Sequence, residues 1–385
     1  MPPLDATQLP DLPAPFWFIQ FFKVLGFLLH MVPMNLWYAG VPLAVAFYFF
    51  GGEHARQWSR RLMLQMPILV AAGINLGIVP LLFLQVAYAK AFYPATILMA
   101  WFWLSVIVLL IPAYYGVYIY ASGMRNGPTA MTPLKRAAGW CSAVMFLAIG
   151  FIFANAMSLT TNPSAWPDLL DRHGVAGAAL GTALNVADPS LWPRWLLMLG
   201  LALITTAAWT ALDTVWLAAQ ESEEYRRWGQ AGALRLALAG AIWSTVTGAW
   251  YLFGTWRPSV FGEMFAFPAI LLTLLTAASC WAPAALLWIV RQKDLNRQNA
   301  LAVAGAQVAV LALNAISRQI VQNIELREVF QPGVSAQPSS PDWGPMAMFL
   351  IVFVAGVGVL AWLFAQLAKA GPATNQQAPS EPTGI

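Results

Sequence analysis

The sequence predicts an all-α membrane protein: a polytopic transmembrane helical bundle of about nine spans, with its N-terminus outside and its C-terminus inside. Of the 385 residues, 59% are hydrophobic and only 9% are charged, whereas soluble domains contain about 25% charged residues. The hydrophobic residues gather in runs of about 20 or more, the length at which a helix crosses a bilayer. These runs favour one transmembrane helical domain over residues 1–370 rather than several soluble domains.

Nine segments are apolar and long enough to be transmembrane helices. The first is long enough to contain a kink at Pro33 or Pro42, because proline removes a backbone hydrogen-bond donor. Two longer connections, 159–190 and 323–345, are rich in Pro, Ser, Asn and Asp. The polar, Pro-rich residues 371–385 are expected to form a disordered cytoplasmic tail. The nine segments are 15–50, 62–89, 93–122, 134–158, 191–219, 232–254, 265–290, 299–322 and 346–369.

The distribution of Lys and Arg predicts the orientation, because these residues accumulate in cytoplasmic connections. Thirteen of them lie in the odd-numbered connections or at the C-terminal end, six lie on the other side, and Lys23 lies within the first span. We therefore expect the N-terminus and both longer connections to face outward. The thirteen are Arg56, Arg60, Arg61, Arg125, Lys135, Arg136, Arg226, Arg227, Arg235, Arg291, Lys293, Arg297 and Lys369, and the six are Lys90, Arg172, Arg194, Arg257, Arg318 and Arg327.

Composition also excludes several classes of function. The pI is about 9.1, but the basic residues are spread over loop ends without a basic run, so nucleic acid is not an expected partner. Cys141 and Cys280 lie in apolar spans and form no CxxC pattern, which excludes a disulfide scaffold, a cysteine zinc site and covalently attached haem. The N-terminal residues carry no positive charge before a long apolar run, so we expect a retained first span rather than a cleaved signal peptide.

The clearest candidate for chemistry is His30, because ionisable groups inside a membrane span are costly and are functional candidates by default. An imidazole in a helical bundle is a usual axial ligand of haem iron, and Lys23, seven residues earlier on nearly the same helix face, would meet a propionate. The alternative is a histidine bonded to a neighbouring helix, with Lys23 reaching the surface. His54 and His173 lie in connections on opposite sides and cannot join His30, so a second ligand would be Met, water or a group from another subunit.

Two further polar features have open interpretations. Asp213 is the only acid well inside a span, and it either relays protons or simply reaches water near the inner end of the fifth span. The eighth span ends in NAISRQIVQNIELRE, which places Arg318, Gln319, Gln322 and Glu325 near the outer boundary. These residues either line a pocket for a quinol head or haem propionate, or form an ordinary polar helix end.

Short motifs in the first, fourth, fifth and eighth spans follow one another in an order that is known from one protein family. A histidine in the first span closely precedes a proline, at His30 and Pro33, after an N-terminus expected outside. The fourth span follows a Lys-Arg pair and ends at an Asn-Pro step, in LKRAAGWCSAVMFLAIGFIFANAMSLTTNP. The fifth follows an Asp-Pro step in ADPSLWPRWLLML, and Ser317, Arg318 and Gln319 stand where the family has Gly-Arg-Gln-Pro-Trp. In this order, and in the count of nine spans, the chain resembles subunit I of the cytochrome bd quinol oxidases.

The departures from that family change the expected activity. The resemblance implies a second haem-ligating histidine at the start of the fifth span, where this chain has Leu197, and an acid near Ala315. The paired glutamates of the third span have no counterpart in ILMAWFWLSVIVLLIPA, and the segment after the sixth span is too short for the family's long quinol-binding loop. Three haems cannot be held in this way, so the chain alone is not expected to reduce oxygen.

What remains is a divergent member that lacks most haem ligands. The resemblance implies a membrane subunit of a respiratory electron-transfer complex in the bacterial inner membrane, passing electrons between quinol or quinone and a periplasmic cytochrome. At most one b-type haem would be ligated by His30, with Lys23, Arg318 and Gln319 contacting a propionate or quinol. Expected partners are other membrane and periplasmic redox subunits, lipid and quinone. The alternative is a haem-free membrane anchor or quinone-binding subunit, and a transporter is less favoured because broken helices with paired charges are not evident.

Overall fold

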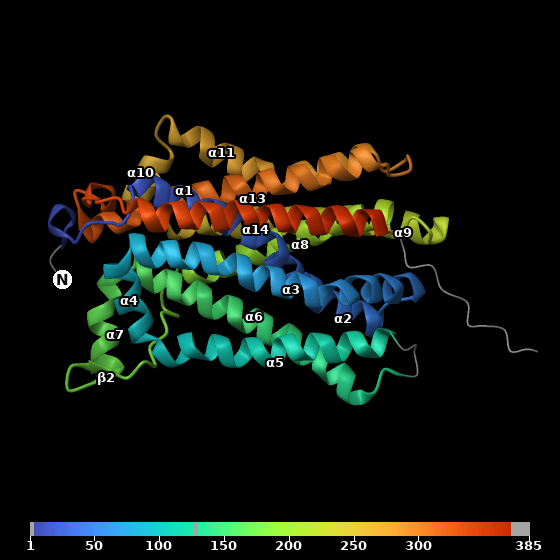
Figure 1. Ribbon diagram of the computed structural model, residues 1–385, viewed down its shortest axis with the longest axis horizontal. Helices are drawn as coiled ribbons and strands as arrows, with labels where there is room; N and C mark the ends of the chain where they lie inside the picture. The colour runs from blue at the N-terminus through green and yellow to red at the C-terminus, as the bar shows by residue number, and fades with distance from the viewer. Residues whose placement is uncertain (1–3, 126–129, 371–385) are drawn as a thin grey trace, which may run out of the picture.

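The computed structural model describes residues 4–125 and 130–370, and these form a bundle of helices that run along a common axis (Figure 1). The predicted tail 371–385 lies outside the described residues. The helices in chain order are α1 (Phe16–Asn35), α2 (Val41–Phe50), α3 (Glu53–Ala87), α4 (Ala89–Leu98), α5 (Ala100–Arg125), α6 (Pro133–Thr161), α7 (Trp166–Arg172), α8 (Leu191–Leu212), α9 (Glu223–Thr255), α10 (Pro258–Met264), α11 (Ala269–Ser279), α12 (Ala282–Ile289), α13 (Arg297–Glu325) and α14 (Trp343–Ala370).

Shorter elements complete the fold. Two π-helical segments, η2 (Leu36–Gly40) and η5 (Asp213–Leu217), continue α1 and α8. The 3-10 segments are η1 (Ala6–Gln8), η4 (Pro163–Ala165), η6 (Leu326–Glu328) and η7 (Val334–Ala336). The strands are β1 (Leu4–Asp5), β2 (Gly174–Val175), β3 (Ala178–Ala179) and β4 (Phe330–Gln331). The all-α membrane bundle predicted from the sequence is therefore confirmed.

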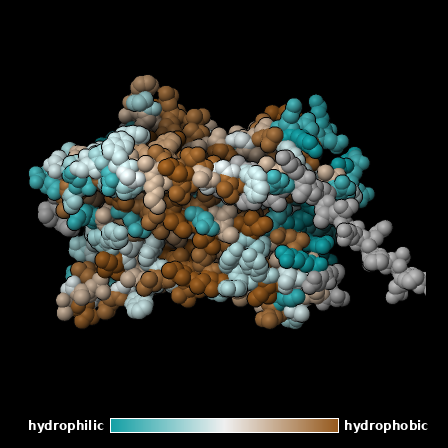
Figure 2. Space-filling model, in the orientation of Figure 1, coloured by the Kyte–Doolittle hydropathy of each residue, from teal (hydrophilic) through white to brown (hydrophobic). Residues whose placement is uncertain are grey.

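Seven helices of the described chain are long and apolar enough to cross a membrane, and the bent pair α10–α11 adds an eighth if it counts as one span. In α14 the qualifying apolar stretch, Trp343–Val359, is shorter. Each of the nine predicted segments falls on helical structure, while the count of nine spans and the orientation stay predictions. Figure 2 shows hydrophobic side chains across the middle of the visible face and hydrophilic ones toward its two ends, as a lipid-embedded surface requires.

Two predicted boundaries differ from the structure. The third span begins at Ala100 rather than at 93, because the chain breaks at Met99 and α4 is a separate short helix. The backbone around this break bonds to a distant loop: the Trp101 amide donates to the Gly181 carbonyl over 3.0 Å, and the Leu98 carbonyl accepts from Ala183 over 2.9 Å. These hydrogen bonds satisfy the backbone amide and carbonyl groups that would have paired with each other in a continuous helix.

The predicted segment 265–290 is also interrupted. It contains α11 and α12, which are separated at Cys280 and Trp281, and α10 meets α11 at an angle of 91°. Pro268 and Pro283 stand at the starts of α11 and α12, where proline is favoured because the first turn of a helix needs no amide donor.

In the first span, where a kink is expected at Pro33 or Pro42, the structure has the π-helical segment η2 between these two prolines. All five of its residues are buried. α6 approaches this segment closely at Gly150, where a Cβ atom would lie 2.5 Å from the Tyr38 ring. A larger residue at this position would push η2 away from α6.

The N-terminal segment packs on the second long connection, which the sequence did not predict. β1 pairs in parallel with β4, and the Leu4 amide donates to the Val329 carbonyl over 2.7 Å. Further along, the Leu12 amide donates to the Pro338 carbonyl over 2.8 Å. These residues close the end of the bundle at which the chain starts (Figure 1).

Candidate functional site

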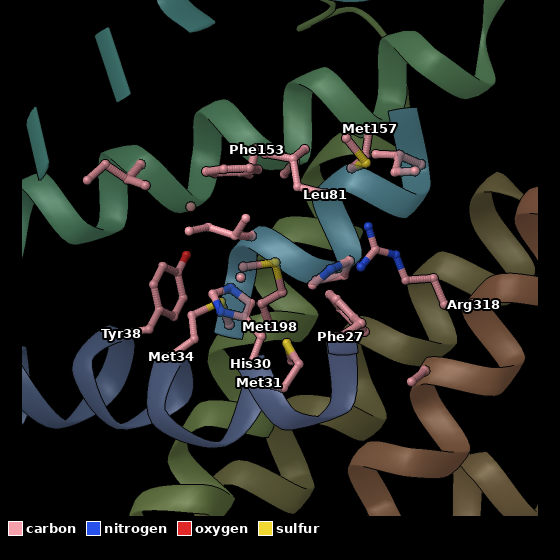
Figure 3. A pocket seen from close by; sticks show the side chains of 18 of the residues that line it. Phe27, His30, Met31, Met34, Tyr38, Leu81, Phe153, Met157, Met198 and Arg318 are labelled. Atoms are coloured by element: carbon pink, nitrogen blue, oxygen red, sulfur yellow. The ribbon is translucent and has the colours of Figure 1, made fainter. Parts of the chain in front are cut away.

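A cavity of about 290 Å³ lies within the bundle, between α1, α3, α5, α6, α8 and α13. We call it the first cavity. Its walls are mostly apolar, and Figure 3 shows His30 pointing into it beside Met34 and Met198, with Tyr38 and Arg318 at opposite ends of the view. The predicted residues His30, Lys23, Arg318 and Gln319 all line this one cavity, although they come from α1 and α13.

His30 is held in one orientation by the backbone of α3. Its Nδ1 atom lies 2.8 Å from the Gly73 carbonyl oxygen. A carbonyl oxygen can only accept, so Nδ1 carries the proton and donates, and in the neutral ring Nε2 keeps its lone pair. Nε2 makes no hydrogen bond within the described part of the chain. This is the arrangement in which an imidazole is ready to bind a metal, with the second nitrogen fixing the ring.

Two glycines of α3 make room for this contact. Gly73 supplies the carbonyl, and at Gly77 a Cβ atom would lie 2.9 Å from the His30 ring. Gly26 of α1 similarly lets the helices approach, because a Cβ there would lie 3.0 Å from Pro80. The spacing of Gly73 and Gly77 is that of a GxxxG motif, which brings transmembrane helices together.

Lys23 is buried rather than extended to the surface, with 8% of its area exposed. Its Nζ atom donates to Gln319 Oε1 over 2.6 Å and to Gln322 Oε1 over 2.5 Å, and it lies 4.6 Å from the centre of the Tyr88 ring. No carboxylate pairs with it among the residues that the structure describes. The charge is therefore solvated by amide oxygens and an aromatic ring alone.

Arg318 is a second cation on the same wall. Its guanidinium lies 4.5 Å from the centre of the Phe27 ring, and it forms no hydrogen bond or ion pair with any described residue. The side chain of Arg318 has a large exposed area, and that area faces the first cavity inside the bundle (Figure 3). Two cations without an acidic partner create a site that favours an anionic group.

A second cavity of about 380 Å³ adjoins the first, between α8, α9, α11 and α13. Both cavities share the side chains of Phe27, Met31, Met157, Met198 and Arg318 as walls. Met is unbranched and adapts its rotamer readily, so these shared walls can adjust to a bound molecule.

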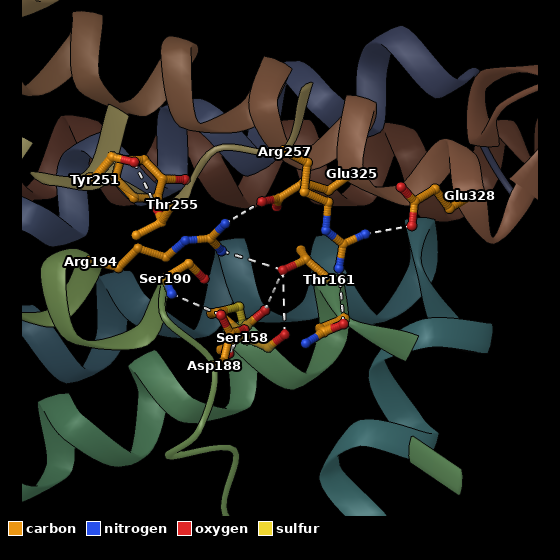
Figure 4. Close-up of polar contacts among 12 residues, drawn as sticks. Ser158, Thr161, Asp188, Ser190, Arg194, Tyr251, Thr255, Arg257, Glu325 and Glu328 are labelled. Carbon is orange, nitrogen blue, oxygen red and sulfur yellow. Dashed lines mark hydrogen bonds and ion pairs between the residues drawn. The ribbon is translucent and has the colours of Figure 1, made fainter. Parts of the chain in front are cut away.

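One end of the second cavity is polar (Figure 4). Arg194 of α8 forms an ion pair with Glu325 of α13, and it also donates to Thr161 Oγ1 over 3.3 Å. Beside this pair, Arg257 donates to Glu328 over 2.5 Å and to Asn162 over 2.9 Å. The ends of α6, α8, α9 and α13 are thus tied together by charged groups.

The positions that distinguish this chain from the resembled family also face the cavities. Leu197, which stands where the resemblance implies a second haem-ligating histidine, lines the second cavity. Ala315, which stands where it implies an acid, lines the first. The cavities are therefore present, while the ligands implied by the resemblance are not.

Asp213 lies apart from both cavities. It is the first residue of η5, only 1% exposed, and Arg61 donates to its two carboxylate oxygens over 2.9 to 3.2 Å. Arg61 also pairs with Glu221 over 2.9 Å. Asp213 therefore does not simply reach water, and its role as a proton relay stays a prediction.

The other histidines and the cysteines lie away from the cavities. The ring of His54 is 6.0 Å from that of Tyr225, and His173 lies at the C-terminal end of α7, and neither lines the first cavity with His30. Cys141 and Cys280 are both free. Among the described residues no three His, Cys, Asp or Glu side chains converge on a metal site. A haem needs no such group, because one axial ligand suffices.

Sequence reasoning missed Arg194, Tyr88 and the two glycines of α3. Arg194 was assigned only to the outer side, because its partner Glu325 is 131 residues away in the chain. The GINLG stretch was the one local signal, since its glycine spacing predicts close helix packing.

Comparisons with known proteins support the fold. No protein-family model matches the chain, and no curated protein matches its sequence. Among solved structures, the bd oxidase from Geobacillus thermodenitrificans is similar with a TM-score of 0.68 and 11% sequence identity, over 94% of this chain and 100% of that chain. This chain has the fold of a bd oxidase chain. At that identity the similarity shows the fold alone, and the assignment to subunit I stays a prediction.

Proposed function

We propose that this chain is a bd-like membrane subunit of a respiratory electron-transfer complex in the bacterial inner membrane. It passes electrons between quinol or quinone and a periplasmic cytochrome partner, through one b-type haem ligated by His30. The observation that carries the proposal is the geometry of His30, whose Nδ1 donates to the Gly73 carbonyl over 2.8 Å while Nε2 faces a cavity that two unpaired cations also line.

The residues present fit a haem. His30 would ligate the iron, and Lys23, Arg318 and Gln319 would meet a propionate, which supplies the anion that both cations lack. When bound, the haem would supply one-electron transfer.

The chain's own residues prepare this site. The Gly73 carbonyl fixes the imidazole plane, and the apolar walls exclude water. Gln319 donates to the Tyr88 hydroxyl over 2.8 Å, which turns its carbonyl oxygen toward Lys23. The hydroxyl of Tyr88 in turn donates to Asn323 over 2.6 Å, so the ammonium group is held by an ordered network.

The single haem site also implies that the chain works with partner subunits. A single haem at His30 gives no continuous electron path across a bilayer, so other membrane and periplasmic redox subunits must complete it. We propose cytochromes for the periplasmic side. Asp213 is a candidate proton relay at the opposite end of α8, where it is buried against Arg61.

A difference spectrum tests the proposal. We expect the purified chain, with its partners attached, to show a Soret band and a pyridine-haem signature of b-type haem. His30→Ala should abolish the part of the haem absorbance that comes from haem bound to this chain. His173→Ala, at the C-terminal end of α7 and outside both cavities, is the control and should leave the spectrum unchanged. A chain without haem absorbance that still purifies with a haem-rich partner would contradict the proposal.

That contrary result would favour the second candidate, a haem-free membrane anchor or quinone-binding subunit. The observation in its favour is that His30 is the single imidazole on the walls of the first cavity. Quinone binding without haem would then be the activity to measure.

A further inference from the structure

The first long connection contains an apolar stretch that belongs to no membrane span. No charged residue occurs in 174–187, GVAGAALGTALNVA, and the polar side chains in it are those of Thr182 and Asn185. These residues form the hairpin β2–β3 and the loop after it, at the end of the bundle where the chain starts (Figure 1). Turns and loops at a water-exposed end are normally polar, so an apolar hairpin there indicates a contact with another molecule.

The register of the hairpin places its apolar side chains on one face. Val175 lies directly opposite Ala178, and Leu180 follows Ala178 by two residues, so the three side chains share a face. All three residues are exposed, Val175 by 62% and Leu180 by 50%. We call this face, together with the exposed turn residues Ala176 and Gly177, the hairpin patch.

The turn of the hairpin is apolar at a position where a polar residue is favoured. Ala176 and Gly177 connect the two strands with φ angles of 52° and 79°. Positive φ at both central residues is the conformation of a type I′ turn, in which Asn-Gly or Asp-Gly is preferred because a Cβ atom is strained there. Alanine therefore keeps the tip of the hairpin apolar against the local conformational preference.

The loop after the hairpin is fixed to a helix that lines the first cavity. The Asn185 amide donates to Asn155 Oδ1 over 3.0 Å, and the Asn185 side chain donates to Ser158 Oγ over 2.9 Å. Both acceptors belong to α6, which also contributes Met157 to the wall of the first cavity. The hairpin patch therefore has a defined position relative to the site of His30.

The hairpin patch does not continue the lipid-facing surface. The exposed apolar side chains of α5 begin at Trp101, and Figure 1 shows the hairpin beyond the start of that helix, next to α7. α7 carries the exposed ion pair of Asp168 and Arg172, and Asp171 is exposed as well. An apolar patch with charged residues at its edge is typical of a contact with another protein.

The size of the hairpin patch restricts the kind of partner. Its five residues are far fewer than the roughly 20–30 that each side contributes to a stable interface, whereas weak contacts between electron-transfer proteins bury less area. Because residues 174–187 are uncharged, a charge that the partner buried there would lack a counterion. The patch therefore fits a partner that binds transiently through an uncharged surface.

We propose that the hairpin patch is the docking site of a soluble redox protein. The inference rests on the proposed function for the identity of this protein, which is the periplasmic cytochrome that exchanges electrons with the chain. The distribution of Lys and Arg predicts that this end of the bundle faces outward, where such a protein is found. The docked cytochrome contacts a loop that is hydrogen-bonded to α6, on the wall of the first cavity.

Photocrosslinking in intact cells tests the docking site. Val175 is replaced by the photoreactive residue p-benzoylphenylalanine, and in the control Ser335 is replaced, an exposed residue of η7 in the other long connection. We expect position 175 to form an adduct with a soluble protein that stains for covalently attached haem in a denaturing gel. Position 335 should give at least about tenfold less of this adduct.

A charge on the hairpin patch provides the second measurement. With the photoreactive residue at position 175, Leu180→Glu should lower the yield of the adduct about tenfold, because the partner would bury a carboxylate without a counterion. Leu180 is exposed, so the substitution leaves the packing of the bundle intact. The matched control is Gln331→Glu at an exposed position of β4, which should leave the yield unchanged.

Several outcomes would overturn the inference: lipid adducts in place of protein at position 175, a protein adduct without haem, an equal yield at position 335, or a yield that Leu180→Glu does not lower. The haem spectrum of the purified chain separates this test from that of the proposed function. A His30-dependent Soret band without the haem-staining adduct overturns the docking site alone. The adduct on a chain that binds no haem of its own supports the docking site and contradicts the proposed function.

Discussion

The imidazole of His30 is held by one hydrogen bond to the backbone, so its orientation depends on how closely α3 approaches α1. Gly73 provides the acceptor at 2.8 Å, and Gly77, one turn later, leaves the space that the ring occupies. Both glycines lack a Cβ atom, which allows the two backbones to lie close together. At the scale of single residues, the candidate haem ligand therefore needs these glycines as much as it needs the histidine.

We predict that Gly77→Ala weakens haem binding without unfolding the bundle. The added Cβ would lie 2.9 Å from the His30 ring, closer than real Cβ contacts, so the ring or α3 must shift. A shift of this kind in a group that positions a metal ligand typically lowers affinity about 10-fold to 100-fold. The haem-to-protein ratio and the Soret maximum of the purified chain measure the effect.

The control for this substitution is Gly305→Ala, where a Cβ meets nothing within 4 Å. It should keep the wild-type ratio. Equal haem content in both variants would show that the packing of Gly77 against His30 does not matter for the cofactor.

The sequence predicted the ionisable residues of the site but not the groups that orient them. His30 and Lys23 stood out because polar residues in an apolar span are rare, and their spacing placed them on one helix face. The carbonyl of Gly73 could not be found in this way, because every residue has a carbonyl and only the fold shows which one is near. Arg194 was equally hidden, since its partner Glu325 comes from another helix.

At the scale of elements, the π-helical segment η5 continues α8 where Asp213 meets Arg61 of α3. A π-helical turn changes the direction of side chains and often marks a functional position. The contacts from Arg61 to both carboxylate oxygens tie α3 to the end of α8. Asp213 is buried, so its negative charge depends on Arg61 for compensation, while Arg61 also pairs with Glu221.

We predict that Asp213→Asn destabilises the bundle by about 3 kcal/mol, because it leaves the charge of Arg61 only partly compensated by Glu221. The matched control is Asp168→Asn, which removes an exposed pair with Arg172 on α7 and should cost less than about 1 kcal/mol. Unfolding in mixed micelles with increasing denaturing detergent gives both values. A similar midpoint for the two variants would contradict the structural role of Asp213.

The sequence was informative about which segments are helical and less so about where helices break. Hydrophobic runs identified every long helix, because satisfying the backbone inside lipid requires helical structure. The break at Met99 was missed, since the groups that compensate it lie in the distant segment around Gly181 and Ala183. The break at Cys280 and Trp281 was missed because the run stays apolar through it.

At the scale of the whole molecule, the two ends of the bundle differ. The N-terminal segment, both long connections and the polar end of the second cavity lie at one end, and the connections between α2 and α3 and between α12 and α13 lie at the other (Figure 1). Pairing of β1 with β4 joins residues from the two ends of the chain, which hydropathy cannot predict. The distribution of Lys and Arg predicts that the end with the long connections faces outside.

We predict that a membrane-impermeant thiol reagent reaches this end from outside the cell. In a Cys141→Ser background, where Cys280 is buried, Ala178→Cys tests the first long connection and Gln292→Cys tests the connection before α13. Both native residues are exposed, so both cysteines are available to reagent. We expect position 178 to be labelled in intact spheroplasts and position 292 only after the membrane is permeabilised. The reverse result would move the polar end of the second cavity, with Arg194 and Glu325, to the cytoplasmic side. A periplasmic cytochrome could then not receive electrons at this end, and the partner would have to be sought on the opposite face.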